Sequence, residues 1–191
     1  MKTFFSLICL TLLIISIQGC SSFLSAVTAD PIEDKGDKRT TGSTLDDEMI
    51  EIKALVNIDK ADEELAHAHI VAVSFNGVVL LAGQVNTAEQ RLLAEQTVDK
   101  INKVRRIHNE ITVSGATSMV ARSNDSWITT KVKTKLLANS EVEGGRIKVV
   151  TENGVVYLMG LVTRDEATRA AEYARQTGGV QKVVRIFEYI E

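Results

Sequence analysis

Three histidines and two cysteines are the residues of this 191-residue chain best suited to bind a metal ion or to act as nucleophiles. His67 and His69 are two positions apart at the start of an expected strand, where alternate side chains share a face. Such a pair could supply half of a metal site, but the third histidine, His108, lies far along the sequence. Exposed histidines at a strand edge are the more common arrangement, and we expect no bound metal.

Sequence motifs for enzymatic chemistry are also missing from the chain. It contains no Gly-x-Ser-x-Gly nucleophile motif, no glycine-rich phosphate-binding loop and no zinc-binding helix motif. The acidic clusters at 46–48 and 62–64 are typical of a helix start and a loop, because carboxylates favour the positive end of a helix dipole. We therefore expect no catalytic residues and no cofactor, and the sequence favours a protein that is not an enzyme.

Cys20 has a setting in which its thiol would be modified. Lys2 is followed by an apolar stretch over residues 4–17, which is too short to span a bilayer comfortably. The stretch ends in Gly19-Cys20, which resembles the lipobox of bacterial lipoproteins; an ordinary secretory signal with a chance cysteine is the alternative. The resemblance implies a signal peptide over residues 1–19 and acylation of Cys20, for example by palmitate. Because no Asp follows Cys20, it also implies anchoring to the periplasmic face of the outer membrane.

Residues 20–45 are expected to form a flexible tether that begins at the lipidated N-terminus. They are rich in Ser, Thr, Asp, Lys and Gly, include the only proline, Pro31, and show no hydrophobic period. Cys9 would be removed with the signal peptide, so the mature chain would contain no disulfide. A coil of this length averages roughly 25–30 Å from end to end. It would keep the folded part near a membrane without holding it against the surface.

Residues 126–138 are expected to form a helix with an unusual outward side. At about 100° per residue, Ile128, Val132 and Leu136 form one stripe that would face a core. The opposite side would carry Trp127, Thr130, Thr134 and Leu137, bordered by Lys131 and Lys133. An indole ring favours the headgroup level of a bilayer, and lysines favour an anionic surface. The alternative is that Trp127 is buried between two modules, since single tryptophans are usually mostly buried.

An equivalent helix earlier in the chain lacks these features. Met49 has the position of Trp127, and Leu55 has that of Lys133. Residues 46–51 include four carboxylates, which an anionic lipid surface would repel. We therefore expect the first helix to be structural and the second to bind.

Two copies of one hairpin motif organise the rest of the chain. Residues 73–85 have the sequence VSFNGVVLLAGQV, and residues 150–162 have the sequence VTENGVVYLMGLV, with eight of thirteen positions identical. In both copies an Asn-Gly pair separates two apolar runs. Because Asn and Gly tolerate the positive φ angles of a two-residue turn, each copy predicts a β-hairpin.

A helix is expected before each hairpin, and a helix with a closing strand after it. Asp46-Asp47 and Asn124-Asp125-Ser126 are typical N-cap residues for the first helices. Thr87 with Gln90, and Thr163 with Glu166, fit the capping box of the later helices. The expected closing strands cover residues 104–113 and 180–190. Each unit then has the order αββαβ, an α+β fold in which a three-stranded mixed sheet packs on two helices.

This pattern resembles the BON domain, a small bacterial module of periplasmic and membrane-associated proteins. The resemblance rests on the Val-x-Leu-x-Gly-x-Val of each hairpin, on the capped helix that follows, and on residues 180–184. It implies two tandem BON modules, module 1 over residues 46–115 and module 2 over residues 122–191. With the lipobox, the chain is similar to dual BON-domain outer-membrane lipoproteins, and residues 124–132 and 151–154 strengthen that match.

The resemblance implies a non-enzymatic, lipid-anchored periplasmic protein that supports outer-membrane integrity. It would bind anionic phospholipid, such as phosphatidylglycerol or cardiolipin, through the first helix of module 2, which carries Trp127. The alternative is a protein-interaction adaptor whose same face docks an envelope protein, for instance one of the outer-membrane protein assembly machinery. The envelope location that the lipobox implies and the lack of a strong basic patch disfavour nucleic-acid binding.

Overall fold

The computed structural model describes residues 40–115 and 118–190. These residues belong to one compact unit, Gly36–Glu191. The expected signal peptide, the acylated Cys20 and most of the expected tether lie outside the described residues. The signal peptide, the acylation and the tether up to residue 39 therefore stay predictions from the sequence, whereas the prediction that the tether reaches residue 45 is wrong, because a helix begins at Thr41.

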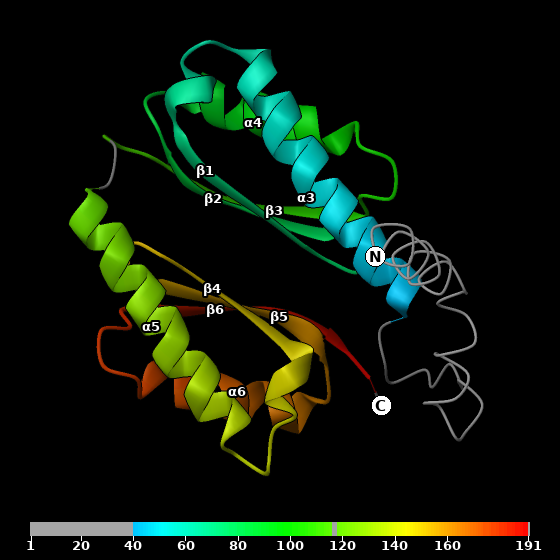
Figure 1. Cartoon of the computed structure of the whole chain (residues 1–191), viewed down its shortest axis with the longest axis vertical. Helices are drawn as coiled ribbons and strands as arrows, with labels where there is room; N and C mark the ends of the chain where they lie inside the picture. Colours follow the sequence, from blue (N-terminus) through cyan, green and yellow to red (C-terminus); the bar gives the residue numbers. More distant parts are fainter. Residues whose placement is uncertain (1–39, 116–117, 191) are drawn as a thin grey trace, which may run out of the picture. The chain divides into compact units, whose positions relative to one another are not determined.

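The first module is a three-stranded sheet with two helices on one of its faces (Figure 1). Its elements follow in the order α3 (Thr41–Ala61), the 3-10 turn η1 (Leu65–His67), β1 (His69–Phe75), β2 (Val78–Val85), α4 (Ala88–Asp99) and β3 (Arg106–Val113). Strand β2 lies in the middle, antiparallel to β1 and parallel to β3. The parallel pair forms because α4 carries the chain back along the sheet before β3 begins.

The second module repeats this architecture. Its elements are α5 (Met119–Leu137), the 3-10 turn η2 (Gly144–Arg146), β4 (Ile147–Glu152), β5 (Val155–Val162), α6 (Arg164–Arg175) and β6 (Lys182–Tyr189). Strand β5 lies between β4, which is antiparallel to it, and β6, which is parallel to it. The predicted α+β fold, with the order αββαβ and mixed sheets packed on two helices, is confirmed in both modules.

Both Asn-Gly pairs form the predicted hairpin turns. The φ angle is 52° at Asn76 and 75° at Gly77, and it is 50° at Asn153 and 75° at Gly154. Two successive residues with positive φ are characteristic of a type I′ turn, whose twist matches that of the two strands it joins.

The first helix of each module begins earlier than expected. Thr40 caps α3 and Ser118 caps α5, and each hydroxyl accepts a hydrogen bond from the backbone N–H three residues later. The prediction that Asp46-Asp47 and residues 124–126 begin these helices is wrong. It took the Asp and Asn residues just before each apolar stripe as N-caps. Those residues lie inside the helices, because α3 already begins at Thr41 and α5 at Met119.

The aspartates that resemble N-caps, Asp47 and Asp125, instead bind the hairpin turns. Each is buried, and each carboxylate accepts hydrogen bonds from the two backbone N–H groups of the Asn-Gly pair in its own module. The distances are 2.7 and 2.8 Å in the first module and 2.7 and 2.9 Å in the second. The same contact therefore joins helix to turn in both copies.

The later helices begin with the predicted capping boxes. Thr87 and Gln90 form one at α4, and Thr163 and Glu166 form the other at α6. Burial acts to raise the pKa of Glu166, but its hydrogen bonds to the backbone and hydroxyl of Thr163, together with the Glu143 backbone and the charge of Arg146, hold the pKa below its ordinary value. Helix α4 ends at Asp99, and Ile101, which follows the helix, is buried.

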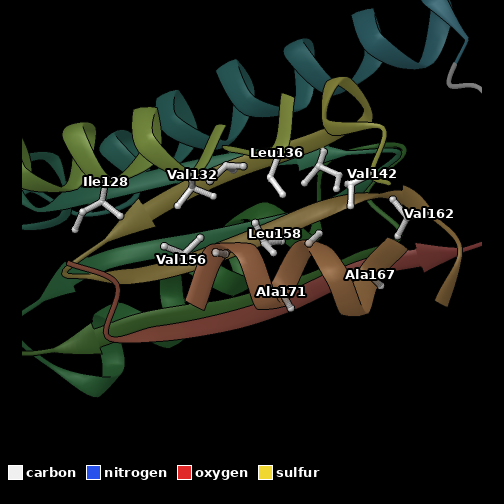
Figure 2. Packing of buried hydrophobic residues seen from close by; sticks show 13 residues of the cluster. Ile128, Val132, Leu136, Val142, Val156, Leu158, Val162, Ala167 and Ala171 are labelled. Carbon is white, nitrogen blue, oxygen red and sulfur yellow. The ribbon is translucent and has the colours of Figure 1, made fainter. Parts of the chain in front are cut away.

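Each module has a hydrophobic core between its helices and its sheet. Figure 2 shows Ile128, Val132 and Leu136 in a row along α5, facing Val156 and Leu158 of β5. Helix α6 approaches the same core through Ala167, Ala170, Ala171 and Ala174. In the first module the corresponding residues of α3 are Ile50, Ala54 and Ile58. The predicted core stripe of α5 is therefore confirmed, and α3 has an equivalent stripe.

A third hydrophobic cluster contains residues from the other faces of both sheets. Its buried members are Phe75, Val78, Leu80, Ala82, Tyr157, Met159 and Ile186. Because alternate residues of a strand point to opposite faces, β2 meets the helices on one side and this cluster on the other, and all eight of its residues are buried. Polar contacts accompany the cluster: Gln84 donates to Glu152 at 2.8 Å, and Lys148 pairs with Glu51 at 2.6 Å.

Candidate functional site

Helix α5 turns one side toward its core and the opposite side toward solvent. Ile128, Val132 and Leu136 are fully buried, whereas Trp127 is 62% exposed and Leu137 is 65% exposed. The alternative in which Trp127 is buried between two modules is therefore wrong, because the core stripe sets the rotation of the helix and directs the indole ring outward. Among the described residues, no helix has the length and apolar composition that spanning a bilayer requires.

The exposed apolar surface of α5 continues toward the start of the helix. Met119 is 75% exposed and Val120 is 79% exposed, and at about 100° per residue both lie on the side of Trp127. The sequence-based prediction missed them because it began the helix at Ser126; the cap residue Ser118 was the available signal. The outer face of α5 is defined here as Met119, Val120, Trp127, Thr130, Thr134 and Leu137.

The two lysines expected at the borders of this face have different surroundings. Lys131 is half-buried and donates a hydrogen bond to the carbonyl oxygen of Gly178, and its neighbour Lys135 donates to the carbonyl oxygen of Gln176 at 3.1 Å. Both ammonium groups thus lie near the C-terminal end of α6, where the helix dipole favours cations. Lys133 is exposed on the other border. Lys133 is therefore better placed than Lys131 to meet an external anion.

A hollow of about 530 Å³ opens beside the C-terminal end of the outer face. Leu137 and Lys133 form part of its wall. The other apolar and cationic lining residues are Phe75, Ile147, Leu161, Arg146 and Lys148. Arg146 is paired with Glu143 and Lys148 with Glu51. Because both of these cations have acidic partners and Glu143 also lines the hollow, its wall combines apolar side chains with paired charges.

The equivalent helix α3 has no exposed indole, and its carboxylates are largely engaged. Met49 occupies the position of Trp127 and is 49% exposed. Asp47 is buried against the hairpin turn, Asp46 pairs with Lys103 at 2.7 Å, and Glu51 is in the ion pair with Lys148. The repulsion of anionic lipid expected from these acids is therefore smaller than the sequence suggested, because most of the charges already have partners.

The three histidines are not gathered at one site. His67 lies in η1 and His69 begins β1, so the prediction that they share a strand face is wrong. His69 Nε2 lies 3.3 Å from a carboxylate oxygen of Glu152. His108 lies in β3, where burial, together with the charge of Arg106, lowers its pKa. Within residues 40–115 and 118–190, no three His, Cys, Asp or Glu side chains are grouped to hold a metal ion.

Comparison with protein families matches the two modules separately. The BON domain matches residues 46–115 and residues 124–190, which together make up more than half of the chain. The hairpin, the capped second helix and the closing strand of each module all lie within the matched ranges.

Three relatives extend the similarity over most of the chain. The "Outer membrane lipoprotein DolP" of Haemophilus influenzae is 37% identical over 177 residues, which cover 93% of this chain and 92% of that protein. The "21 kDa hemolysin" of Actinobacillus pleuropneumoniae is 40% identical over 155 residues, covering 81% and 80%. The "Osmotically-inducible protein Y" of Escherichia coli is 30% identical over 148 residues, covering 74% and 72%.

Proposed function

The chain belongs to the BON-domain family, and we propose that its second module binds anionic phospholipid through the outer face of α5 and thereby supports outer-membrane integrity. The proposed role is that of a binding protein and not of an enzyme. The observation that carries it is the exposure of Trp127 and Leu137 on the side of α5 opposite a complete core.

The chemistry of the outer face suits the interface of a bilayer. Trp127 would place its indole ring at the headgroup level, where the ring contacts apolar chains and its N–H meets polar groups. Met119, Val120 and Leu137 would add apolar area on either side. A lysine near an anionic leaflet contributes about 1 kcal/mol, so Lys133 supplies a charge-dependent part of the binding. Phosphatidylglycerol and cardiolipin are the anionic lipids that the proposal names.

The proposed lipid anchor makes a weak contact sufficient. Acylation of Cys20 would attach the chain to the periplasmic face of the outer membrane, in agreement with the name of the lipoprotein relative. An anchored protein has a high effective concentration of lipid around it, so the outer face of α5 needs little intrinsic affinity to be occupied. The anchor would determine the location of the protein, and α5 would determine which lipid it meets.

Vesicle flotation of an unanchored chain that begins at Ser21, and so lacks both the expected signal peptide and Cys20, tests the proposal. We expect the chain to float with phosphatidylcholine vesicles that contain phosphatidylglycerol or cardiolipin, and not with phosphatidylcholine alone. Trp127→Glu should abolish flotation without lowering the melting temperature, because the ring is exposed. Leu92→Glu is the matched control, since Leu92 is a 54% exposed apolar residue of α4. It should float like the unsubstituted chain.

The adaptor alternative gives a different result in the same experiment. If the outer face of α5 docks an envelope assembly protein and not lipid, the unanchored chain will not float with any of the vesicles. Equal flotation of the Trp127→Glu and Leu92→Glu chains would also contradict the proposal, because lipid contact would then lie elsewhere.

A further inference from the structure

The side of α3 that faces away from its sheet carries a row of exposed apolar residues. Leu45 is 59% exposed, Met49 49%, Ile52 56% and Val56 43%. At about 100° per residue, their mean direction is opposite to that of the core residues Ile50, Ala54 and Ile58. These four exposed residues are called the α3 stripe. A contiguous exposed apolar patch of this kind marks an interaction surface.

The α3 stripe has the spacing of a two-stranded coiled coil. Its members are successively four, three and four residues apart. This spacing makes Met49 and Val56 the a positions of a heptad, and Leu45 and Ile52 the d positions. The stripe is narrow and has charged residues on both borders, which fits a second helix better than the broad apolar region of a bilayer. Asp59 occupies the next d position and ends the seam.

We propose that α3 is a self-association surface, on which the α3 stripes of two copies of this chain pack in parallel. In a parallel coiled coil, a g residue meets the e residue that lies five positions later in the other helix. Glu48 is a g residue, Lys53 is the e residue five positions later, and both are exposed. A symmetric dimer therefore contains two Glu48–Lys53 pairs. Leu55 and Lys60 have the same relation, and the aliphatic part of the lysine would cover the leucine.

The charge pattern disfavours the antiparallel arrangement. In that arrangement e residues face e residues and g residues face g residues, so Glu48, a g residue, would lose Lys53, an e residue, as its partner. Like charges across a helix pair are destabilising, whereas the parallel pairing places opposite charges together. The two borders of the α3 stripe are thus complementary to each other, which makes a second copy of this chain the fitting occupant.

The parallel arrangement brings the starts of the two α3 helices together. Thr40, the cap of α3, is the first residue of the described structure, and 39 residues precede it. A parallel pair places both Thr40 residues at the same end. The antiparallel pair would separate them by about the length of the helix, roughly 30 Å. A seam of four residues is short, so we expect appreciable dimer only where chains are concentrated on one membrane.

Cysteine cross-linking of the full-length chain in membrane vesicles tests the proposal. Ile52→Cys and Leu45→Cys should each form a disulfide with the same residue of a second copy under mild oxidation, because identical d positions meet in a parallel seam. Asn57→Cys is the control, since Asn57 is exposed on α3 but lies off the stripe. The unsubstituted chain gives the baseline for Cys9 and Cys20. We expect several-fold more cross-linking at the stripe than at Asn57.

A charge exchange separates pairing from an effect on folding. With Ile52→Cys as the reporter, Glu48→Lys should lower the cross-linking yield roughly three- to ten-fold, because two attractive pairs become repulsive. Adding Lys53→Glu should restore the yield, since the pairs then form with reversed charges. A mere defect in folding would not be repaired by the second substitution.

Several results would overturn the proposal. Equal cross-linking at Asn57 would mean random collision, and preferential cross-linking between Leu45→Cys and Val56→Cys chains would mean an antiparallel pair. If Ile52→Glu abolishes flotation with vesicles, the α3 stripe is a membrane surface and not a helix interface. The proposal does not rest on lipid binding by α5: the cross-links are expected in the Trp127→Glu chain as well, so the two proposals fail separately.

Discussion

The carboxylate of Asp125 accepts a hydrogen bond from the backbone N–H of Gly154 at 2.9 Å. This contact joins the middle of α5 to the tip of the β4–β5 hairpin, and Asp47 makes the same contact in the first module. A type I′ turn directs both of its N–H groups to the same side, and a buried donor without a partner is costly. The aspartate thus fixes the turn and, through it, the position of the helix on the sheet.

Replacing Asp125 should destabilise the second module. Asp125→Ala removes a charged acceptor from two backbone N–H groups, one of which is buried, so we expect the free energy of unfolding to fall by about 2–4 kcal/mol. Chemical denaturation measures this change. Asn124→Ala, at an exposed neighbouring position of α5, is the control and should change the stability by less than about 0.5 kcal/mol. Equal effects of the two substitutions would contradict the role given to Asp125.

The glycines of the two turns should differ in their tolerance of a side chain. Gly154→Val should cost more than about 1 kcal/mol, because a β-branched residue adopts positive φ only with strain. Gly77→Val should cost more, since its Cβ would lie 2.5 Å from the backbone oxygen of Lys103, whereas at Gly154 the Cβ would meet only the flexible side chain of Gln181. Gly145→Val, with open space around the added atom, should be nearly neutral. Melting temperatures of the three variants check this order.

Alkaline pH should destabilise the fold through Tyr157. Burial, with the nearby charges of Glu110 and Glu152, raises the pKa of Tyr157 to about 12. Below the ordinary value near 10, the phenol is protonated in both the folded and the unfolded state, so ionisation changes nothing. Between 10 and 12 the unfolded state ionises first, and the folded state loses stability, by about 1.4 kcal/mol at a pH of about 11.

The pH dependence of Tyr157→Phe tests this assignment. That variant should lose less stability than the unsubstituted chain between pH values of about 9 and 11, by about 1.4 kcal/mol. Tyr189→Phe, which removes the phenol of a 46% exposed tyrosine, serves as the control. If both variants respond to pH like the unsubstituted chain, Tyr157 is not the group that titrates.

The lysines beside α5 should contribute unequally to lipid binding. Lys133→Ala should weaken flotation with anionic vesicles and reduce its dependence on salt, because salt screens charge interactions. Lys131→Ala should also lower thermal stability, since Lys131 donates to the carbonyl oxygen of Gly178. A Lys131→Ala and Lys133→Ala double variant should show the flattest salt dependence. Flotation over a salt series, with melting curves of each variant, distinguishes the charge effect from the structural one.

Processing at Cys20 can be tested directly. Cys20→Ala should yield either an unprocessed precursor or an unanchored periplasmic form, because the acylated residue is gone. Metabolic labelling with a palmitate analogue, followed by membrane fractionation, measures both results. Acyl label that persists on the Cys20→Ala chain would refute the lipobox assignment.

The local order of both modules could be predicted from the sequence. The Asn-Gly turns, the capping boxes at Thr87 and Thr163, and the core stripe through Ile128 all depend on neighbours within a few residues. Turn chemistry and helical period act over that range, so a pattern of residue types is enough to identify them. The order αββαβ follows from adding these local patterns along the chain.

The tertiary structure decided the partners of polar side chains and the exposure of the apolar ones. Asp125 resembles an N-cap in sequence, but its acceptors serve a turn 28 and 29 residues away, and Lys131 meets a carbonyl 47 residues away. The α3 stripe could also be identified only once the structure showed which side of that helix is buried in the core. Such relations depend on which segments the folded chain brings together, and no local period encodes them. The sequence by itself determined the elements, and packing between distant segments determined which of their residues are buried and which are exposed.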